Sequence, residues 1–591
     1  MGVFLLRFNL SWPTHYTGVI LTGLLILVPA HALICRWAGL YRGLWIFASL
    51  PDLKRVLRAV ALTSAVLVVW VALYREIPAI PRSSLVLYPI LLASIMAGGR
   101  VTYRMWKEHR LYGGLVGLGK PVVIVGAGRG GAMLVRELER SSDWRVVGLV
   151  DDDEAKWGRE MLGHKVFGSV DSLPAVLRSE KVRHVILAMP SAAIAVRKKA
   201  ADLAVREGAH VLTVPGLEDV MSGRVAVSAI RPVSIEDLLG RDAVRIDTHD
   251  IRSMLADKTI LVTGAGGSIG FELCRQLARF GIGRLVLIEL SELNLYTVEQ
   301  WFAKQHPDMR IHPLVGDVKD PRRMQEIFTA WRPQVVFHAA AYKHVPLMEV
   351  GNAWQAMRNN VLGTLRVATA ACESGAEQFV MISTDKAVNP TSVMGATKRL
   401  AEMVCESMQA HGGPTRFEMV RFGNVLGSTG SVIPKFQAQI AAGGPVTVTH
   451  PEITRYFMSI PEAAQLVLQA AAMGKGGEIF VLDMGEPVRI VDLARNMIRL
   501  SGYHENDIRI TFTGLRPGEK LYEELLADSE ETRGTPHPQL RIASSRPVDI
   551  SLLQRLSDWL ESSRPLPDGE VRAALTAWVP EYTPVDESPS L

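Results

Sequence analysis

The apolar residues of this chain form long runs near the N-terminus and short, repeated runs after residue 120. The run Tyr16–Cys35 is uncharged and mostly aliphatic, and it is long enough to cross a bilayer as a helix. Shorter runs follow at Ala59–Tyr74 and Ser83–Gly99. We expect about three transmembrane helices within residues 1–110, and a re-entrant or buried helix is the alternative for each of the two shorter runs.

Basic residues around these runs predict their orientation. Between the second and third runs lie only Arg75 and Arg82. The other flanks are richer in cations, with Arg36, Arg42, Lys54, Arg55 and Arg58 after the first run and Arg100, Arg104, Lys107 and Arg110 after the third. By the positive-inside rule, the large C-terminal part is cytoplasmic and the N-terminus lies outside. The N-terminal run does not have the pattern of a cleaved signal peptide.

A first α/β unit is predicted over residues 120–240. PVVIVGAGRGGAMLVRELER reads as a strand, a glycine turn and a helix, with Gly126, Gly128 and Gly131 in GxGxxG spacing. Asp151 ends the next strand, WRVVGLVDDD, and the strands HVILAMP and HVLTVPG follow between helical stretches. This pattern predicts a compact parallel unit. Its role stays open between nucleotide binding and a spacer or regulatory function.

A second and larger α/β unit is predicted over residues 250–575. Near-continuous apolar strands alternate with helical stretches, which predicts a parallel sheet covered on both faces. The strands read TILVTG, RLVLIEL, RIHPLVGDV, QVVFHAA, QFVMIS and RFEMVRFG. The part from Pro445 onward mixes short strands and helices and is expected to cap the sheet. Residues 576–591, which are rich in Pro, Ser and acidic side chains, are expected to form a frayed tail.

The first strand of this second unit leads into the pattern of a dinucleotide-binding turn. Glycines allow a tight turn, let the backbone approach a pyrophosphate, and let the helix pack on the strand. The helix N-terminus then faces the phosphates. Glu289 ends the next apolar run, where a ribose-binding carboxylate is expected. The residues predicted to contact NAD in this turn are Thr263, Gly264, Gly267, Ser268, Ile269 and Gly270.

Composition narrows the function. The net charge is +5, from 65 basic and 60 acidic residues, which is too small an excess to predict a nucleic-acid-binding protein. The positive mean hydropathy agrees with membrane segments. The four cysteines are scattered singly, so neither a disulfide framework nor a zinc site is expected, and no metal is predicted.

The order of segments in the second unit resembles the extended short-chain dehydrogenase/reductase superfamily. The resemblance implies that Asp317 and Val318 of GDVKD meet adenine and that Ala339, Ala340 and Ala341 line the cofactor. That superfamily carries Tyr-x-x-x-Lys, in which the tyrosine is the base and the lysine holds the nicotinamide ribose. This chain reads Met394-Gly-Ala-Thr-Lys398. A thioether cannot accept a proton, so ordinary alcohol dehydrogenase chemistry lacks its base.

Ser-Thr-Asp-Lys at residues 383–386 indicates what replaces that base. Together with YKHVPLMEV, RFGNVLGSTGSVIPKF, ITRYFM and LRPGEKLYEE, it resembles the membrane-bound nucleotide-sugar 4,6-dehydratases of bacterial glycan synthesis. The resemblance covers nearly the whole chain and implies a cytoplasmic catalytic domain on the bacterial inner membrane. Such proteins commonly have four spans, and MGVFLLRFNLSWP resembles the tail of a missing first helix.

The resemblance implies a reaction at UDP-N-acetylglucosamine. The C4 carbon is oxidised by NAD, water leaves from C5 and C6, and the hydride returns to C6, which gives a UDP-2-acetamido-2,6-dideoxy-4-hexulose. Asp385 is the expected acid for the C6 hydroxyl and Lys386 the expected base for C5, with a pKa depressed by burial. Thr384 is expected to hydrogen-bond the C4 hydroxyl, Lys398 to hold the ribose, and Met394 to line the sugar pocket.

Cations in the second unit are expected to bind the UDP-sugar. Arg provides bidentate geometry for a pyrophosphate. Glu289 favours NAD, although Arg284 leaves NADP possible. A homo-oligomer and a bilayer are the expected partners. The predicted substrate-binding residues are Lys343, Asn424, Lys435, Arg455 and Arg516.

Two other functions stay open from the sequence. A nucleotide-sugar 4-epimerase of the same fold also oxidises C4, but it would normally retain the tyrosine and needs no acid for C6. A membrane-tethered nucleotide sensor without turnover fits the missing tyrosine, but it does not need the Asp385–Lys386 pair.

Overall fold

The structure is a computed structural model. It describes residues 3, 16–40, 50–73, 82–112, 119–141, 143–189, 192–214, 230–233, 247–504, 506–526, 532–543, 551–562 and 564–584. Arg42 and Arg75 of the predicted flanking loops lie outside the described residues, as does the end of the predicted tail, 585–591.

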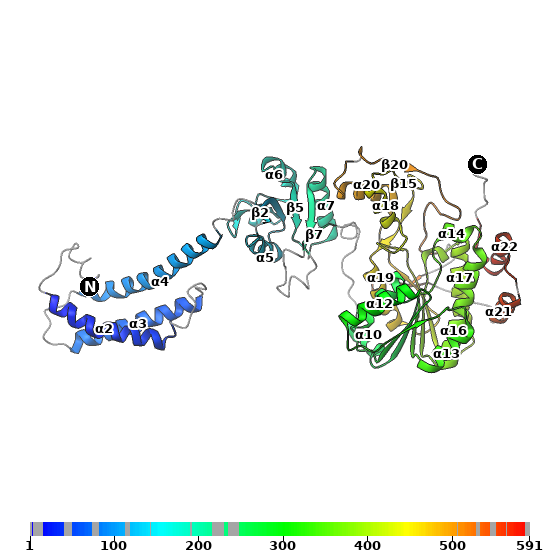
Figure 1. Cartoon of the computed structure of the whole chain (residues 1–591), viewed down its shortest axis with the longest axis horizontal. Helices are drawn as coiled ribbons and strands as arrows, with labels where there is room; N and C mark the ends of the chain where they lie inside the picture. The colour runs from blue at the N-terminus through cyan, green and yellow to red at the C-terminus, as the bar shows by residue number, and fades with distance from the viewer. Residues whose placement is uncertain are drawn as a thin grey trace. The chain divides into compact units, whose positions relative to one another are not determined.

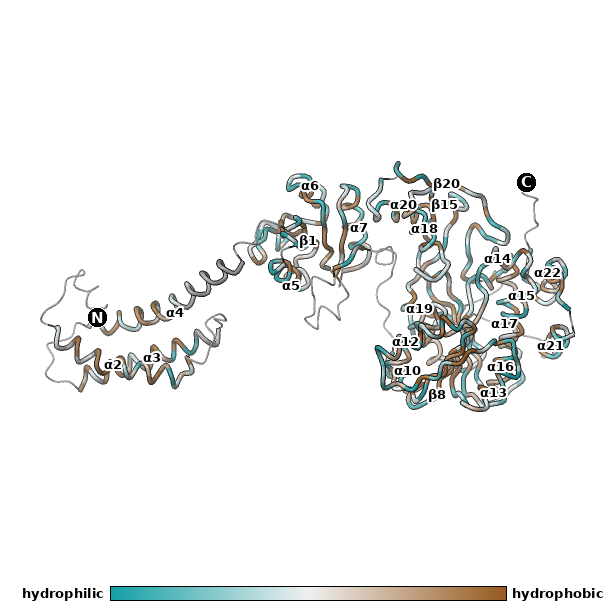
Figure 2. The backbone as a smooth tube through the Cα atoms, viewed as in Figure 1, coloured by the Kyte–Doolittle hydropathy of each residue, from teal (hydrophilic) through white to brown (hydrophobic). Residues whose placement is uncertain are grey.

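The N-terminal part is helical. Its helices are α2 (Thr17–Trp37), α3 (Leu50–Leu73) and α4 (Arg82–Tyr112) (Figure 1). Within the described residues, Ile20–Trp37 and Lys54–Leu73 are long and apolar enough to cross a membrane, whereas the apolar stretch of α4 is the shorter Ser83–Gly99. Figure 2 shows apolar residues along α2 and α3. Side chains such as Leu25, which is 78% exposed, turn outward, as expected of helices that lipid would cover.

The first sheet has five strands in the order β2-β1-β5-β6-β7. Its strands are β1 (Lys120–Val125), β2 (Trp144–Val150), β5 (His184–Leu187), β6 (His210–Thr213) and β7 (Arg231–Pro232). The associated helices are α5 (Arg129–Leu138), α6 (Leu173–Ser179) and α7 (Ile194–Arg206), and the hairpin β3 (Glu160–Met161) and β4 (His164–Lys165) follows β2. The predicted strands are confirmed, and β7 adds an antiparallel edge.

In the first sheet, the glycine turn after β1 contacts Asp151, which directly follows β2. The Asp151 carboxylate accepts a hydrogen bond from the backbone N–H of Ala127 at 2.6 Å and pairs with Lys156 at 3.0 Å. The chain divides into two compact units, residues 1–122 with 132–147 and residues 123–131 with 148–591. That boundary passes through the first sheet, so the division at 110–120 and 240–250 stays a prediction.

The second sheet has nine strands in the order β10-β9-β8-β11-β12-β13-β18-β22-β21. The parallel strands are β8 (Thr259–Thr263), β9 (Arg284–Glu289), β10 (Ile311–Val315), β11 (Val335–His338), β12 (Gln378–Ile382), β13 (Arg416–Arg421) and β18 (Ile479–Leu482). Its first six strands follow the doubly wound order 3-2-1-4-5-6 of dinucleotide-binding folds. All six predicted strands are confirmed.

Helices cover both faces of this sheet, as predicted. One buried apolar cluster packs α10 (Thr248–Leu255), α11 (Ser268–Leu277), α12 (Glu292–Gln305) and α19 (Ile460–Met473) on one face. The second packs α13 (Pro321–Trp331), α16 (Gly363–Ser374) and α17 (Val393–Ala410) on the other. The short helices α14 (Val345–Glu349) and α15 (Ala353–Ala356) and a π-helical turn at Met357–Leu362 lead into α16. Ligands of such sheets bind beyond the carboxyl ends of the strands.

The part after residue 445 does more than cap the sheet. β18 joins β13, and the antiparallel strands β22 (Leu540–Ala543) and β21 (Thr532–Gly534) extend the edge. The remainder forms a small lobe with its own buried cluster, together with residues 424–441 that precede it. This lobe comprises α18 (Val432–Ala441), α20 (Ile490–Leu500) and the strands β14 (Asn424–Val425), β15 (Val446–Val448), β16 (Thr454–Arg455), β17 (Phe457–Met458), β19 (Val488–Arg489) and β20 (Ile510–Phe512).

The predicted frayed tail begins too early. Helices α21 (Leu552–Ser562) and α22 (Asp568–Trp578) pack into a third buried cluster with α15 and α17. Val579 and Tyr582, which were assigned to the tail, are buried in the same cluster. Their apolar side chains therefore hold the chain in place beyond residue 576, despite the polar composition around them.

The buried carboxyl group of Glu418 should make the stability of the protein depend on pH. It lies on β13 with no exposed surface, and burial raises the pKa of its carboxyl to about 8. The folded state therefore holds this proton more tightly than the unfolded chain, and stability falls by up to about 1.4 kcal/mol per pH unit as pH rises from the ordinary pKa toward the raised one. Thermal unfolding of the full chain should show Glu418→Gln raising the Tm at pH 8 and changing it little at pH 5. The exposed control Glu326→Gln should change the Tm little at either pH. An equal gain in Tm at both pH values for Glu418→Gln would contradict this account.

Candidate active site

The glycine turn between β8 and α11 brings three backbone segments close together. Gly264 has φ +64°, and a Cβ atom built on it would lie 2.8 Å from the backbone nitrogen of Ala340. A Cβ on Gly270 would overlap the carbonyl oxygen of Gly264. Both positions therefore require glycine. Helix α11 begins at Ser268, directly after Gly267, so its free N–H groups point beyond the end of β8.

Acidic residues lie beside this turn, as predicted. Glu289 ends β9, and its Oε2 accepts a hydrogen bond from the Gly266 N–H at 2.9 Å. Asp317 follows β10 and pairs with Lys319 at 2.9 Å. Val318 is buried against Gly363, and a Cβ atom built on Gly363 would lie only 2.8 Å from a methyl carbon of Val318. The structure thus gathers Glu289, Asp317 and the glycine turn along one edge of the sheet.

His338, which the sequence analysis did not single out, anchors the Ala339–Ala341 segment. It ends β11, and its Nδ1 lies 2.8 Å from Thr263 Oγ1 and its Nε2 3.0 Å from Thr364 Oγ1. Thr364 donates its own proton to the Asn360 carbonyl, so Nε2 of His338 is the protonated nitrogen. Burial, helped by Lys398, lowers the pKa of His338 to about 3. The ring is therefore a neutral structural link between the two strand ends.

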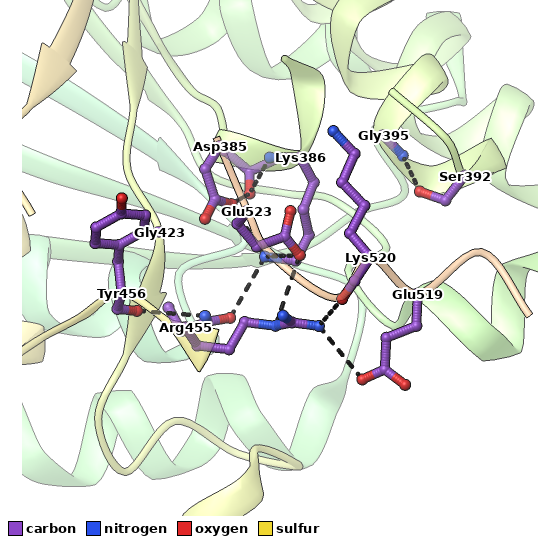
Figure 3. A network of polar contacts seen from close by, with 12 residues as sticks. Asp385, Lys386, Ser392, Gly395, Gly423, Arg455, Tyr456, Glu519, Lys520 and Glu523 are labelled. Carbon is purple, nitrogen blue, oxygen red and sulfur yellow. Dashed lines mark hydrogen bonds and ion pairs between the residues drawn. The ribbon is translucent and has the colours of Figure 1, made fainter. Parts of the chain in front are cut away.

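The segment Thr384–Asp385–Lys386 follows β12 and forms the centre of the site (Figure 3). Asp385 Oδ1 accepts hydrogen bonds from Thr384 Oγ1 at 2.9 Å and from Lys386 Nζ at 3.0 Å. Its Oδ2 is buried and has no partner among the described residues. The side chain of Asp385 is 0% exposed, whereas that of Lys386 is 18% exposed. Lys386 and Thr384 therefore connect the hidden carboxylate to the outside.

The expected depression of the Lys386 pKa is wrong in this structure. Burial does lower the pKa of the ammonium, but Asp385 and Glu523 more than offset that effect, so the pKa lies above its ordinary value. Lys386 Nζ also lies 3.5 Å from Glu523 Oε1 and 3.4 Å from Asn424 Oδ1. The lysine is consequently held as a cation between two buried carboxylates.

Lys398 and Met394 lie in the first half of α17. Lys398 Nζ donates to the carbonyl oxygen of Ile382 at 2.6 Å, and burial lowers its pKa to about 8 although Glu402 acts in the opposite direction. This places the ammonium at the end of β12, close to the segment that begins with Ser383. Met394 is only 2% exposed and belongs to the cluster that includes α22. Its predicted contact with a sugar stays a prediction.

A buried ionic network lies beneath this segment. Glu402 of α17 accepts bidentate hydrogen bonds from Arg421 of β13, at 2.8 Å and 2.7 Å, and another from the hydroxyl of Ser383 at 2.6 Å. Arg399 donates to the same carboxylate at 3.2 Å. Against burial, Arg421 and its neighbours lower the pKa of Glu402 to about 2. The network ties β12, β13 and α17 together where Thr384 begins.

The predicted substrate residues fall into two groups. Asn424 contacts Lys386, and Arg455 lies within 3.6 Å of Glu523, so both belong to the site. Arg516 pairs with Glu519, which also binds Arg455 at 3.4 Å. The structure leaves Lys343 and Lys435 exposed, and their contact with a substrate stays a prediction.

Besides His338, sequence reasoning missed Glu519 and Glu523. Both lie in LRPGEKLYEE, whose cationic Arg516 was singled out while its acids were not. Glu523 is 4% exposed at its side chain and contacts both Lys386 and Arg455. Burial raises its pKa, a change that Lys386 opposes and Asp385 reinforces. Among the described residues, no group of His, Cys, Asp and Glu side chains could hold a metal ion.

Comparisons with known proteins agree over both parts of the chain. Residues 260–545 match the family model described as "Polysaccharide biosynthesis protein", and residues 36–215 match one described as "CoA-binding domain". The capsular polysaccharide biosynthesis protein CapD of Staphylococcus aureus is 46% identical over 87% of this chain and 85% of its own length. The probable polysaccharide biosynthesis protein EpsC of Bacillus subtilis is 41% identical over 95% of this chain and 92% of its own.

A third relative matches about half of the chain. The UDP-glucose 4-epimerase of Rickettsia rickettsii is 35% identical to this chain over 286 residues, which is 47% of this chain and 80% of the epimerase.

Breaking the buried network should cost far more than breaking an exposed ion pair. Glu402→Gln leaves Arg421 without its bidentate partner, and removing one member of a buried pair typically costs about 3–5 kcal/mol. We expect a large drop in the Tm of the full chain. The matched control is Glu326→Gln, which removes the exposed Arg323 pair and should cost less than about 1 kcal/mol. Equal effects of the two substitutions would contradict the importance of the network.

Proposed function

We propose that this chain, which belongs to the family of polysaccharide biosynthesis proteins, is an NAD-dependent nucleotide-sugar 4,6-dehydratase that acts on UDP-N-acetylglucosamine. The observation that carries the proposal is the placement of Lys386 between buried carboxylates at the end of β12, beside Thr384. Elimination of water needs an acid and a base together. An Asp–Lys pair in contact can provide both, whereas Met394 cannot take a proton.

The glycine turn supports the choice of cofactor. Gly264 and Gly270 leave no room for a Cβ, and α11 opens toward the turn, as the binding of a dinucleotide pyrophosphate requires. Glu289 stands where it would bind a ribose hydroxyl and repel a 2′-phosphate, which favours NAD over NADP. When bound, NAD would supply the oxidant that removes the C4 hydride and returns it at C6. Lys398 would hold the nicotinamide ribose.

The side chains of the Thr-Asp-Lys segment would manage the protons. Thr384 would accept the hydrogen bond of the C4 hydroxyl and pass its proton to Asp385, whose Oδ1 lies 2.9 Å away. A neutral Lys386 would take the proton from C5. Asp385 would provide the proton that leaves with the C6 hydroxyl as water. Since the carboxylate has no exposed surface, we assign it the role of proton store and give direct contact with the sugar to Lys386 and Thr384.

The UDP group would bind near the small lobe. Asn424 already contacts Lys386, and Arg455 and Arg516 share Glu519, so an incoming pyrophosphate would compete with that carboxylate for both guanidinium groups. The apolar helices α2 and α3 would anchor the protein in the bacterial inner membrane, with α4 as a further span and the catalytic part cytoplasmic. The product would serve surface polysaccharide synthesis, and we expect a homo-oligomer.

A 4-epimerase is the second candidate, because the Rickettsia rickettsii relative bears that name at 35% identity. The two reactions share oxidation at C4 and differ at C6. An epimerase returns the C4 proton to C4 and needs neither an acid for the C6 hydroxyl nor a base at C5, so the Asp385–Lys386 contact favours dehydration.

The product distinguishes the candidates directly. The full chain in detergent is incubated with UDP-N-acetylglucosamine and followed by proton NMR. Dehydration predicts a new C6 methyl signal, whereas epimerisation predicts UDP-N-acetylgalactosamine. Unchanged substrate with retained cofactor would overturn the enzyme proposal in favour of a sensor.

Asp385→Asn tests the proton store. The amide cannot release a proton, so formation of the methyl product should fall by about a hundred-fold or more while cofactor binding persists. Activity within a few-fold of the parent would show that another group is the acid. The exposed Asp308→Asn serves as the control and should retain full activity.

Gly270→Ala tests the cofactor cradle. The new methyl group would overlap the Gly264 carbonyl oxygen, so the turn must open and we expect NAD affinity, measured by fluorescence titration, to fall at least about ten-fold. Gly534→Ala is the matched control, since nothing lies within 4 Å of its Cβ position. Unaltered affinity in Gly270→Ala would place the cofactor elsewhere.

A further inference from the structure

Two protons have to be stored at this site at the same time. During oxidation at C4, the C4 hydroxyl gives up a proton, and the route through Thr384 leads to Asp385. Lys386 must also lose a proton before it can act as a base, because the structure holds it as a cation. One carboxylate cannot serve both needs, since Asp385 would then be filled by Lys386 before the C4 proton arrived.

We propose that Glu523 is the second acceptor, a positioning residue that takes the ammonium proton of Lys386 and returns it at the end of each turnover. This inference rests on the proposed dehydratase function and adds a residue to it. Glu523 Oε1 lies 3.5 Å from Lys386 Nζ, which also lies 3.0 Å from Asp385 Oδ1, and Figure 3 shows the three side chains together. The lysine therefore touches two separate carboxylates, and each has one proton to receive.

The surroundings of Glu523 suit a carboxylate that changes charge. Its side chain is 4% exposed, so proton exchange with bulk water is restricted and Lys386 is its nearest donor. Burial raises its pKa, as does the neighbouring Asp385. The charged and polar groups around the pair are Arg455, 3.6 Å from Glu523, Lys520, whose charge lowers the pKa of Glu523, and Asn424, 3.4 Å from Lys386. Glu519 faces the far end of Arg455.

The proton count closes over one cycle. The site starts with Lys386 charged and both carboxylates ionised. Transfer from Lys386 to Glu523, together with transfer from the C4 hydroxyl through Thr384 to Asp385, leaves a neutral amine and two protonated carboxyls. Lys386 then takes the C5 proton, while the proton stored on Asp385 passes through Thr384 to the departing C6 hydroxyl. When the hydride returns to C6, Lys386 reprotonates C5, and Glu523 gives its proton back to Lys386.

The pH dependence of Glu523→Gln tests this role. With an internal acceptor, kcat should vary little between pH 6 and 9, because Lys386 does not have to release its proton to bulk water. In Glu523→Gln the lysine must do so, and kcat should fall at least about ten-fold at pH 6 and recover as the pH rises. Glu523→Asp should keep the flat profile. The adjacent Glu524→Gln, whose side chain is 48% exposed and contacts Lys520, is the matched control and should behave as the parent.

The outcomes separate the two proposals. Methyl product from the parent enzyme with a new acidic limb in Glu523→Gln supports the second acceptor. Methyl product with an unchanged profile, or an equal loss of kcat at every pH, overturns it and leaves Glu523 a structural partner of Arg455. Failure of the parent itself to form the methyl product overturns the dehydratase proposal instead.

Discussion

The site depends on one buried carboxylate, that of Glu402. It accepts hydrogen bonds from Ser383, which directly follows β12, from Arg421 of β13 and from Arg399 of α17. A charge buried this deeply is tolerated only when it is fully paired, so the three elements cannot move apart without exposing unpaired ions to a low-dielectric interior. Thr384 follows Ser383, and Lys398 lies one turn before Glu402 on the same helix. The hydrogen bonds of Glu402 therefore fix the position of the Thr384–Lys386 segment.

Above that network, the balance of charge decides which group carries which proton. Asp385 and Glu523 are both buried and both contact Lys386, and Arg455 neutralises the far side. An isolated buried lysine would lose its charge, but the two carboxylates hold this one as a cation. At Lys398 the opposing effect of Glu402 is smaller than that of burial, so the pKa falls to about 8. The two lysines thus differ because their neighbours differ, although both are buried.

The sequence predicted what depends on local pattern. All six strands from β8 to β13, the glycine turn and the position of Glu289 follow from apolar period and glycine spacing, and the structure agrees. The pairing of Lys386 with Glu523 joins residues far apart along the chain, so a local sequence pattern cannot predict it. This separation in sequence also explains why the predicted lowering of the Lys386 pKa was wrong. Burial of the lysine could be predicted, but its contact with Glu523, which raises the pKa, could not. Val579 and Tyr582 were wrongly assigned to a frayed tail because the residues around them are polar, whereas both side chains are buried in the third cluster.

The proposed reaction requires a hydride that leaves C4 and returns to C6 within one active site. UDP-N-acetylglucosamine carrying deuterium at C4 measures this directly, with the isotope located in the product by NMR and mass spectrometry. The account predicts one deuterium in the C6 methyl group, even when unlabelled UDP-N-acetylglucosamine and free NADH are present in excess. A deuterium-free methyl group, or deuterium retained at C4 of an epimerised sugar, would contradict it.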